Sequence, residues 1–148
     1  MLAFVVVPAP ASALIALSFQ SISGSVSLTG AGTPNASLNF GTVSAFEAVA
    51  AGVSRSVGAT SYTISTSFGV RVIRIISLSA NYTLRASLQS AHALTWRVNG
   101  VAMSTSAATV ASTQPFGSTV PHTLEFEVPF THPAGAVNTV LEVIAIAN

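Results

Sequence analysis

Polar and apolar residues alternate with a period of two along most of this chain. Two long runs of this kind are Tyr62–Val72 and Val120–Phe130, and shorter ones cover residues 82–88 and 94–98. Such alternation places one face of a strand on a core and the other toward solvent or a partner. Helical periodicity is hard to find, and the short stretch 45–52 is interpreted as a loop. The pattern therefore predicts an all-β protein.

Turn residues separate these runs. Asn99-Gly100 is a strong hairpin signal, because a type I′ turn needs a positive φ at both central residues. Further breaks are expected at Gln114–Gly117 and His132–Gly135. We expect about seven to nine strands, arranged as a sandwich or barrel. The last run, residues 137–147, is apolar on both faces and is expected to be a central strand or to be covered by a neighbour.

Charge is sparse in this sequence. Charged residues make up 6% of the 148 residues, against about 25% in an average globular protein, and the formal net charge is +1. This balance argues against nucleic-acid binding, which depends on clustered basic residues. It favours a surface covered by neighbouring molecules or an extracellular protein. The chain has no cysteine, so disulfides and thiolate metal sites are excluded.

The first 35 residues differ from the rest of the chain. Residues 1–13, MLAFVVVPAPASA, resemble a secretory signal that ends in small residues, although the basic start is missing; the alternative is an extended N-terminal arm. Residues 14–35 hold an apolar strand and a linker. In that strand, Ile15, Leu17 and Phe19 alternate with small or polar residues, so they are candidates to complete the sheet of another copy. No stretch is apolar and long enough to predict a membrane span.

Groups that carry chemistry are few. His92, His122 and His132 match no metal-binding or catalytic spacing and are interpreted as surface or partly packed residues. Glu125 and Glu127 share one face of a strand, which favours a solvated face or cross-strand pairing with Arg85 or Arg97 over paired-carboxylate catalysis. We predict no catalytic residue, no cofactor and no metal, and hence no enzyme.

Three aromatic side chains are candidates for stacking on a ligand. Trp96 is the only tryptophan, and its place in an alternating run favours the core. If it were exposed instead, Trp96, Tyr62 and Tyr82 could form a platform for a carbohydrate.

A short motif and several strands together resemble a known group of proteins. The features concerned are the segment Leu38-Asn39-Phe40-Gly41, the Trp96–Gly100 hairpin arm and the apolar end at residues 145–148. Together they resemble small secreted bacterial β-sandwich proteins, namely the spore coat protein U group and related pilin-like subunits. The resemblance implies an incomplete immunoglobulin-like antiparallel sandwich. It also implies that the N-terminal strand of one copy fills a groove in the next, with Ile15, Leu17 and Phe19 as the donor residues.

The leading hypothesis is a structural subunit of an extracellular, pilus-like filament or surface layer, with residues 36–148 as the sandwich domain. Its partners would be copies of itself and a secretion or assembly apparatus, at the cell surface. One alternative is a secreted carbohydrate-binding or adhesin module. Another is a viral coat or appendage protein with a jelly-roll sandwich.

Overall fold

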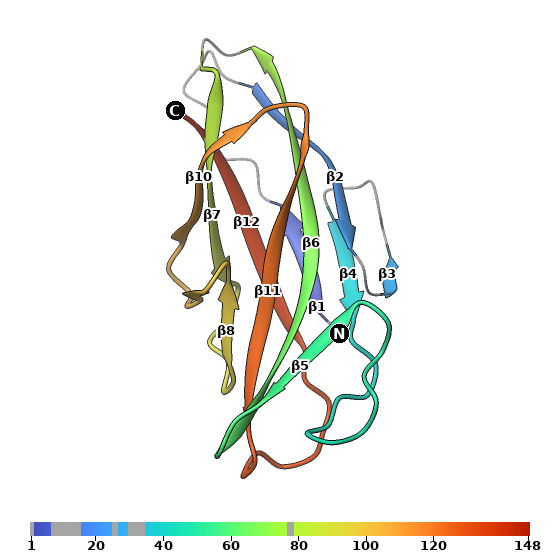
Figure 1. Ribbon diagram of the computed structural model, residues 1–148. Helices are drawn as coiled ribbons and strands as arrows, with labels where there is room; N and C mark the ends of the chain where they lie inside the picture. The colour runs from blue at the N-terminus through green and yellow to red at the C-terminus, as the bar shows by residue number, and fades with distance from the viewer. Residues whose placement is uncertain (1, 7–15, 25–26, 30–34, 77–78) are drawn as a thin grey trace.

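The computed structural model describes residues 2–6, 16–24, 27–29, 35–76 and 79–148 (Figure 1). Strands and the loops that join them make up this part of the chain and no helix occurs in it, so the prediction of an all-β protein is confirmed. The strands are β1 (Leu2–Val6), β2 (Ala16–Gly24), β3 (Ser27–Thr29), β4 (Asn35–Asn39), β5 (Val53–Val57), β6 (Ser61–Ile76), β7 (Asn81–Leu88), β8 (Thr95–Val98), β9 (Val101–Ala102), β10 (Ala108–Pro115), β11 (Thr119–Pro129) and β12 (Thr139–Ala147).

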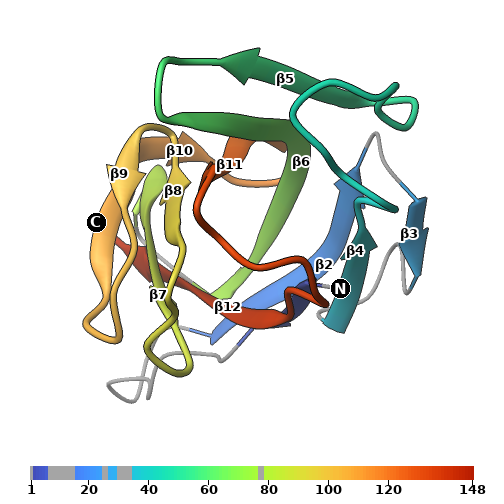
Figure 2. The same cartoon turned by 90° about the horizontal axis from the view of Figure 1, so that it is seen from below.

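The strands form two sheets that enclose a common core, as the end-on view shows (Figure 2). One sheet has the order β10-β7-β12-β1-β4-β3, and the other has the order β2-β6-β11-β8-β9, with β5 also paired to β6. Among the described strands, every pairing is antiparallel except that between β1 and β12. The predicted sandwich is therefore confirmed. Twelve strands are described where alternation predicted seven to nine, because short segments such as Leu2–Val6 and Val53–Val57 also pair.

The two longest strands, β6 and β11, pair along eleven positions and form the centre of their sheet. Their alternating apolar residues lie inside: Ile64 and Phe68 on β6 and Leu124 and Phe126 on β11 are buried. The opposite sheet contributes residues such as Tyr82, Leu84, Leu141 and Val143 from β7 and β12. The period of two thus assigned the inward faces of β6, β7 and β11 correctly, whereas β12, apolar on both faces, gave no such signal.

The predicted hairpin is present between β8 and β9. Asn99 has φ 51° and Gly100 has φ 79°, as a type I′ turn requires. The prediction that β12 is central is also confirmed, since this strand lies between β7 and β1.

Candidate functional site

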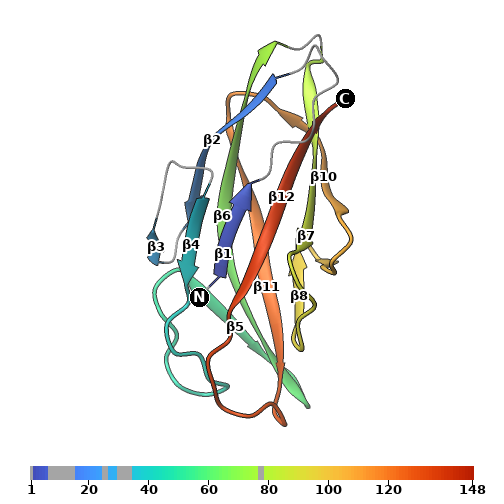
Figure 3. The ribbon, with the colours of Figure 1, turned by 180° about the vertical axis from the view of Figure 1, so that it is seen from behind.

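The position of β1 is the most unusual feature of the topology. This strand lies between β12 and β4, parallel to the first and antiparallel to the second (Figure 3). Leu2 is opposite Thr139, Phe4 is opposite Leu141, and the pairing with β12 continues to Val6. Because both neighbours pair with β1, its removal would leave β12 and β4 each without a partner on one side. We call the space between β12 and β4 that β1 fills the β1 slot.

The residues predicted to act as a donor strand are not the ones in this slot. Ile15 lies outside the described residues. Leu17 and Phe19 lie in β2, where they pair with Arg74 and Val72 on β6 of the same chain. Donation of these residues to another copy therefore stays a prediction, and it would require β2 to leave β6.

The three predicted stacking residues lie in different surroundings. Trp96 is 2% exposed, so its assignment to the core is confirmed. Tyr82 is fully buried, and desolvation raises the pKa of its hydroxyl to about 12. Only Tyr62 is partly open to solvent. The structure does not bring the three together as an exposed row, because alternation turns all of them toward the inside of the sandwich.

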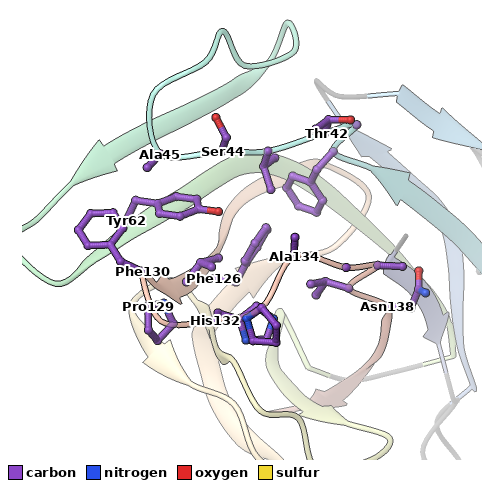
Figure 4. A pocket seen from close by; sticks show the side chains of 18 of the residues that line it. Thr42, Ser44, Ala45, Tyr62, Phe126, Pro129, Phe130, His132, Ala134 and Asn138 are labelled. Atoms are coloured by element: carbon purple, nitrogen blue, oxygen red, sulfur yellow. The ribbon is translucent and has the colours of Figure 1, made fainter.

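A pocket of about 630 Å³ opens at the end of the sandwich where β4 ends and β12 begins (Figure 4). We call it the end pocket. Two loops surround it, residues 40–52 after β4 and residues 130–138 before β12, and the adjoining ends of β6 and β11 complete its wall. Its size is within the range of small-molecule sites in proteins.

Aromatic rings make up much of this pocket. Phe126 is at the centre of the buried ones, with its ring centroid 4.5 Å from that of Trp96 and 5.2 Å from that of Phe40. A second group is a stack in which Phe130 and Tyr62, both in the pocket wall, lie 6.1 Å apart, while Phe46, outside the pocket lining, lies 6.3 Å from Phe130. The planes of these stacked rings are within 28° of each other, so their faces are nearly parallel.

Hydrogen bonds organise the loop 40–52 from within. The Asn39 side chain accepts from the backbone N–H of Gly41, whose φ of 68° suits glycine. Ser44 Oγ accepts from the N–H of Glu47 at 2.9 Å. The Arg55 guanidinium on β5 donates to the carbonyl oxygens of Ser44 and Glu47. The loop is therefore held by Ser44 within it and by Asn39 and Arg55 on the two strands that flank it.

Sequence reasoning missed the end pocket. Phe130 ends the alternating run 120–130, and Phe46 lies in the stretch predicted to be a loop, so neither stood out. One available signal was the apolar character of Phe46 in an expected loop, since an exposed phenylalanine is uncommon on a soluble surface.

The paired glutamates lie on a surface face, as expected. Glu127 Oε2 is 3.2 Å from the Arg97 guanidinium, which confirms Arg97 as a cross-strand partner. A hydrogen bond from Ser61 and another from Arg97 lower the pKa of Glu127. Arg85 instead donates to the carbonyl of Ala107. Within the described residues, no three His, Asp or Glu side chains lie close enough together to hold a metal ion.

His122 differs from the prediction of a surface or partly packed residue. It is 3% exposed, because it belongs to the inward face of β11, and its ring packs against Phe68. Asn99 Nδ2 lies 3.0 Å from His122 Nδ1, while Asn99 Oδ1 accepts from the N–H of Thr123. This second bond fixes the Asn99 amide, so its nitrogen is the donor and His122 Nδ1 is the acceptor. The neutral ring therefore carries its proton on Nε2.

We expect His122 to make the protein sensitive to acid. Desolvation lowers the pKa of His122 in the folded state, so the unfolded chain binds a proton more readily. The free energy of unfolding should then fall below pH 6.5, by up to about 1.4 kcal/mol per pH unit until the folded pKa is reached. Urea denaturation at several pH values measures this slope. His122→Gln should flatten it; a slope as steep as that of the unmodified protein would contradict the assignment.

No helix of the described chain is long and apolar enough to cross a membrane. Comparison with protein-family models, with curated proteins and with solved structures finds no match for this sequence. The function has to be argued from the β1 slot and the end pocket.

Proposed function

We propose that this protein is a structural, non-enzymatic subunit of an extracellular filament or surface layer, assembled by exchange of strands between copies. The observation that carries the proposal is the position of β1, a short strand held between β12 and β4. Nine residues, 7–15, separate it from β2 along the chain. A strand that fills a slot in its own sheet can fill the same slot in a neighbour.

The energetics of an empty slot favour exchange. Without β1, the facing sides of β12 and β4 would each present unpaired N–H and C=O groups, which is the situation that promotes strand addition from another chain. A neighbour's β1 restores both ladders in the same register. When each copy donates to the next and receives from the previous one, the contact does not close, and a filament grows.

The surface of the protein agrees with this role. Only nine of the 148 residues are Lys, Arg, Asp or Glu. Exposed positions on β10 and β5 carry Ser and Thr, including Ser54, Ser56, Thr109 and Ser112. Such a surface can be covered by copies of the same chain without burying unpaired charges, which would be costly.

Residues 14–19 remain the second candidate for the donor. If the chain were processed after Ala13, β1 would be lost and the slot would be open. Ile15, Leu17 and Phe19 would then be close to a new N-terminus and could fill the slot of another copy. The sequence of the first residue in assembled protein distinguishes the two donors.

A reversible lock on β1 tests the proposal. Ala3 and Val140 are opposite each other in the parallel pairing, and the chain has no native cysteine, so Ala3→Cys with Val140→Cys introduces a unique pair. Oxidised as a dilute monomer, this protein should stay monomeric in electron microscopy and sedimentation. After reduction it should form filaments. Filaments that form equally well from the oxidised monomer would rule out exchange of β1.

A further inference from the structure

We propose that the end pocket binds an uncharged carbohydrate. This inference goes beyond the assembly role, which needs only the β1 slot. It rests on three properties of the pocket: an exposed stack of aromatic rings, a lining without charged side chains, and neutral hydrogen-bonding groups beside the rings.

The stack places aromatic faces where a ligand can reach them. Phe46 is 81% exposed and Phe130 is 43% exposed. Val57, also exposed, is opposite Tyr62 in the pairing of β5 with β6. Three of the four exposed large apolar side chains of the described chain therefore gather at this end. An exposed apolar group of this kind on a soluble protein marks a binding surface.

The lining of the pocket contains no Lys, Arg, Asp or Glu among the described residues. Arg55 on β5, outside the lining, donates to the carbonyl oxygens of Ser44 and Glu47. A phosphate or carboxylate would find no Lys or Arg side chain in this lining to offset the loss of its hydration. The ligand that fits is therefore neutral.

Neutral polar groups surround the rings. Figure 4 shows the Tyr62 hydroxyl directed toward the middle of the pocket, with Thr42 and Ser44 on one side and His132 on another. Hydroxyl and imidazole groups donate and accept hydrogen bonds, as the hydroxyls of a sugar do. A sugar ring also has apolar C–H faces that can pack on Phe130 and Tyr62. A purely apolar ligand would leave the polar groups of this pocket without new partners.

The site is built before any ligand arrives. The loop 40–52 is held by Asn39, Ser44 and Arg55, and at its other end Thr66 Oγ1 donates to the carbonyl of Gly52. The second loop is tied down where the N–H of Phe130 donates to Thr60. A preformed pocket loses less conformational entropy on binding, which favours recognition of a small, polar ligand.

The fluorescence of Trp96, the only tryptophan, provides the readout because this side chain lines the pocket. The full chain would be titrated with cellobiose, maltose, lactose and N,N′-diacetylchitobiose. We expect at least one to bind with a dissociation constant of about 1 mM, as is typical of a weak small-ligand site. Glucose 6-phosphate and N-acetylneuraminic acid should not bind, because the described lining holds no Lys or Arg side chain.

Substitutions then locate the site. Phe130→Ala should weaken binding about tenfold or more, which corresponds to the loss of one well-packed contact, and Tyr62→Phe should weaken it less. Ile146→Ala is the matched control, because Ile146 is also exposed but lies near the C-terminal end of β12. Thermal melts must show that each variant stays folded.

The proposal is overturned if none of the four sugars binds at about 50 mM, if the anionic sugars bind as well as the neutral ones, or if Phe130→Ala binds normally. Binding of the uncharged apolar dye Nile red without any sugar would assign the pocket to a hydrophobic ligand instead.

Discussion

Phe126→Ala should lower the free energy of unfolding by about 3–5 kcal/mol, the usual cost of truncating a buried phenylalanine. Phe126 is 3% exposed and lies at the centre of the buried aromatic group, in contact with Phe40 and Trp96. Removing its ring leaves a cavity that β-strand backbones on both sides cannot easily collapse. Urea denaturation followed by far-ultraviolet circular dichroism measures the loss.

The same substitution at an exposed ring is the matched control. Phe46→Ala removes an equally large side chain that is 81% exposed, so its effect on stability should stay within about 0.5 kcal/mol. Equal losses at the two positions would contradict the assignment of Phe126 to the core. Because Phe126 also lines the end pocket, Phe126→Leu should keep most of the stability and is the better variant for binding measurements.

Asn99→Ala should lower the free energy of unfolding by about 2–4 kcal/mol, more than a typical turn substitution. Its side chain contacts the carbonyl of Val110, His122 Nδ1 and the N–H of Thr123, and its φ is 51°. Alanine loses all three contacts and is unfavourable at positive φ, where the cost is about 1–2 kcal/mol. His122 would also be left buried without its partner at Nδ1.

Asn99→Gly separates the two causes. Glycine accepts a positive φ, so this variant measures the loss of the side-chain contacts alone. We expect it to be about 1 kcal/mol more stable than Asn99→Ala and still clearly less stable than the unmodified protein. If Asn99→Gly were as stable as the unmodified protein, the contact between the turn and His122 would contribute nothing to folding.

Much of the fold follows from local sequence patterns, and particular residues show why. In β6 and β11 almost every second residue is apolar over ten positions or more, with Thr66 and His122 as the buried polar exceptions, so only one register of each strand buries the apolar side chains. The Asn99-Gly100 turn is similarly local, because its backbone conformation is available to few residue pairs. These features need no knowledge of distant segments.

The β1 slot and the end pocket depend on contacts between distant segments. Leu2–Val6 is an apolar run that resembles a signal sequence, and nothing local shows that it pairs with residues 139–143. The end pocket brings together Tyr62 on β6 and Phe130 in the loop before β12, and Phe46, in the loop after β4, stacks on Phe130 beside it. The Asn99 turn was predicted, but its contact with His122 arises only once β8 and β11 pair.

Assembly by strand exchange requires that β1 of one copy fills the slot of another. Two variants, Ala3→Cys and Val140→Cys, would be prepared separately, mixed as monomers, allowed to assemble and then oxidised. Each chain has one cysteine, so a disulfide between the two variants can form only when β1 of one lies beside β12 of the other. Mixing Ala3→Cys with Ser56→Cys, on the exposed face of β5, is the control. We predict abundant linked dimers from the first mixture and few from the second; filaments without linked dimers in the first mixture would contradict the account.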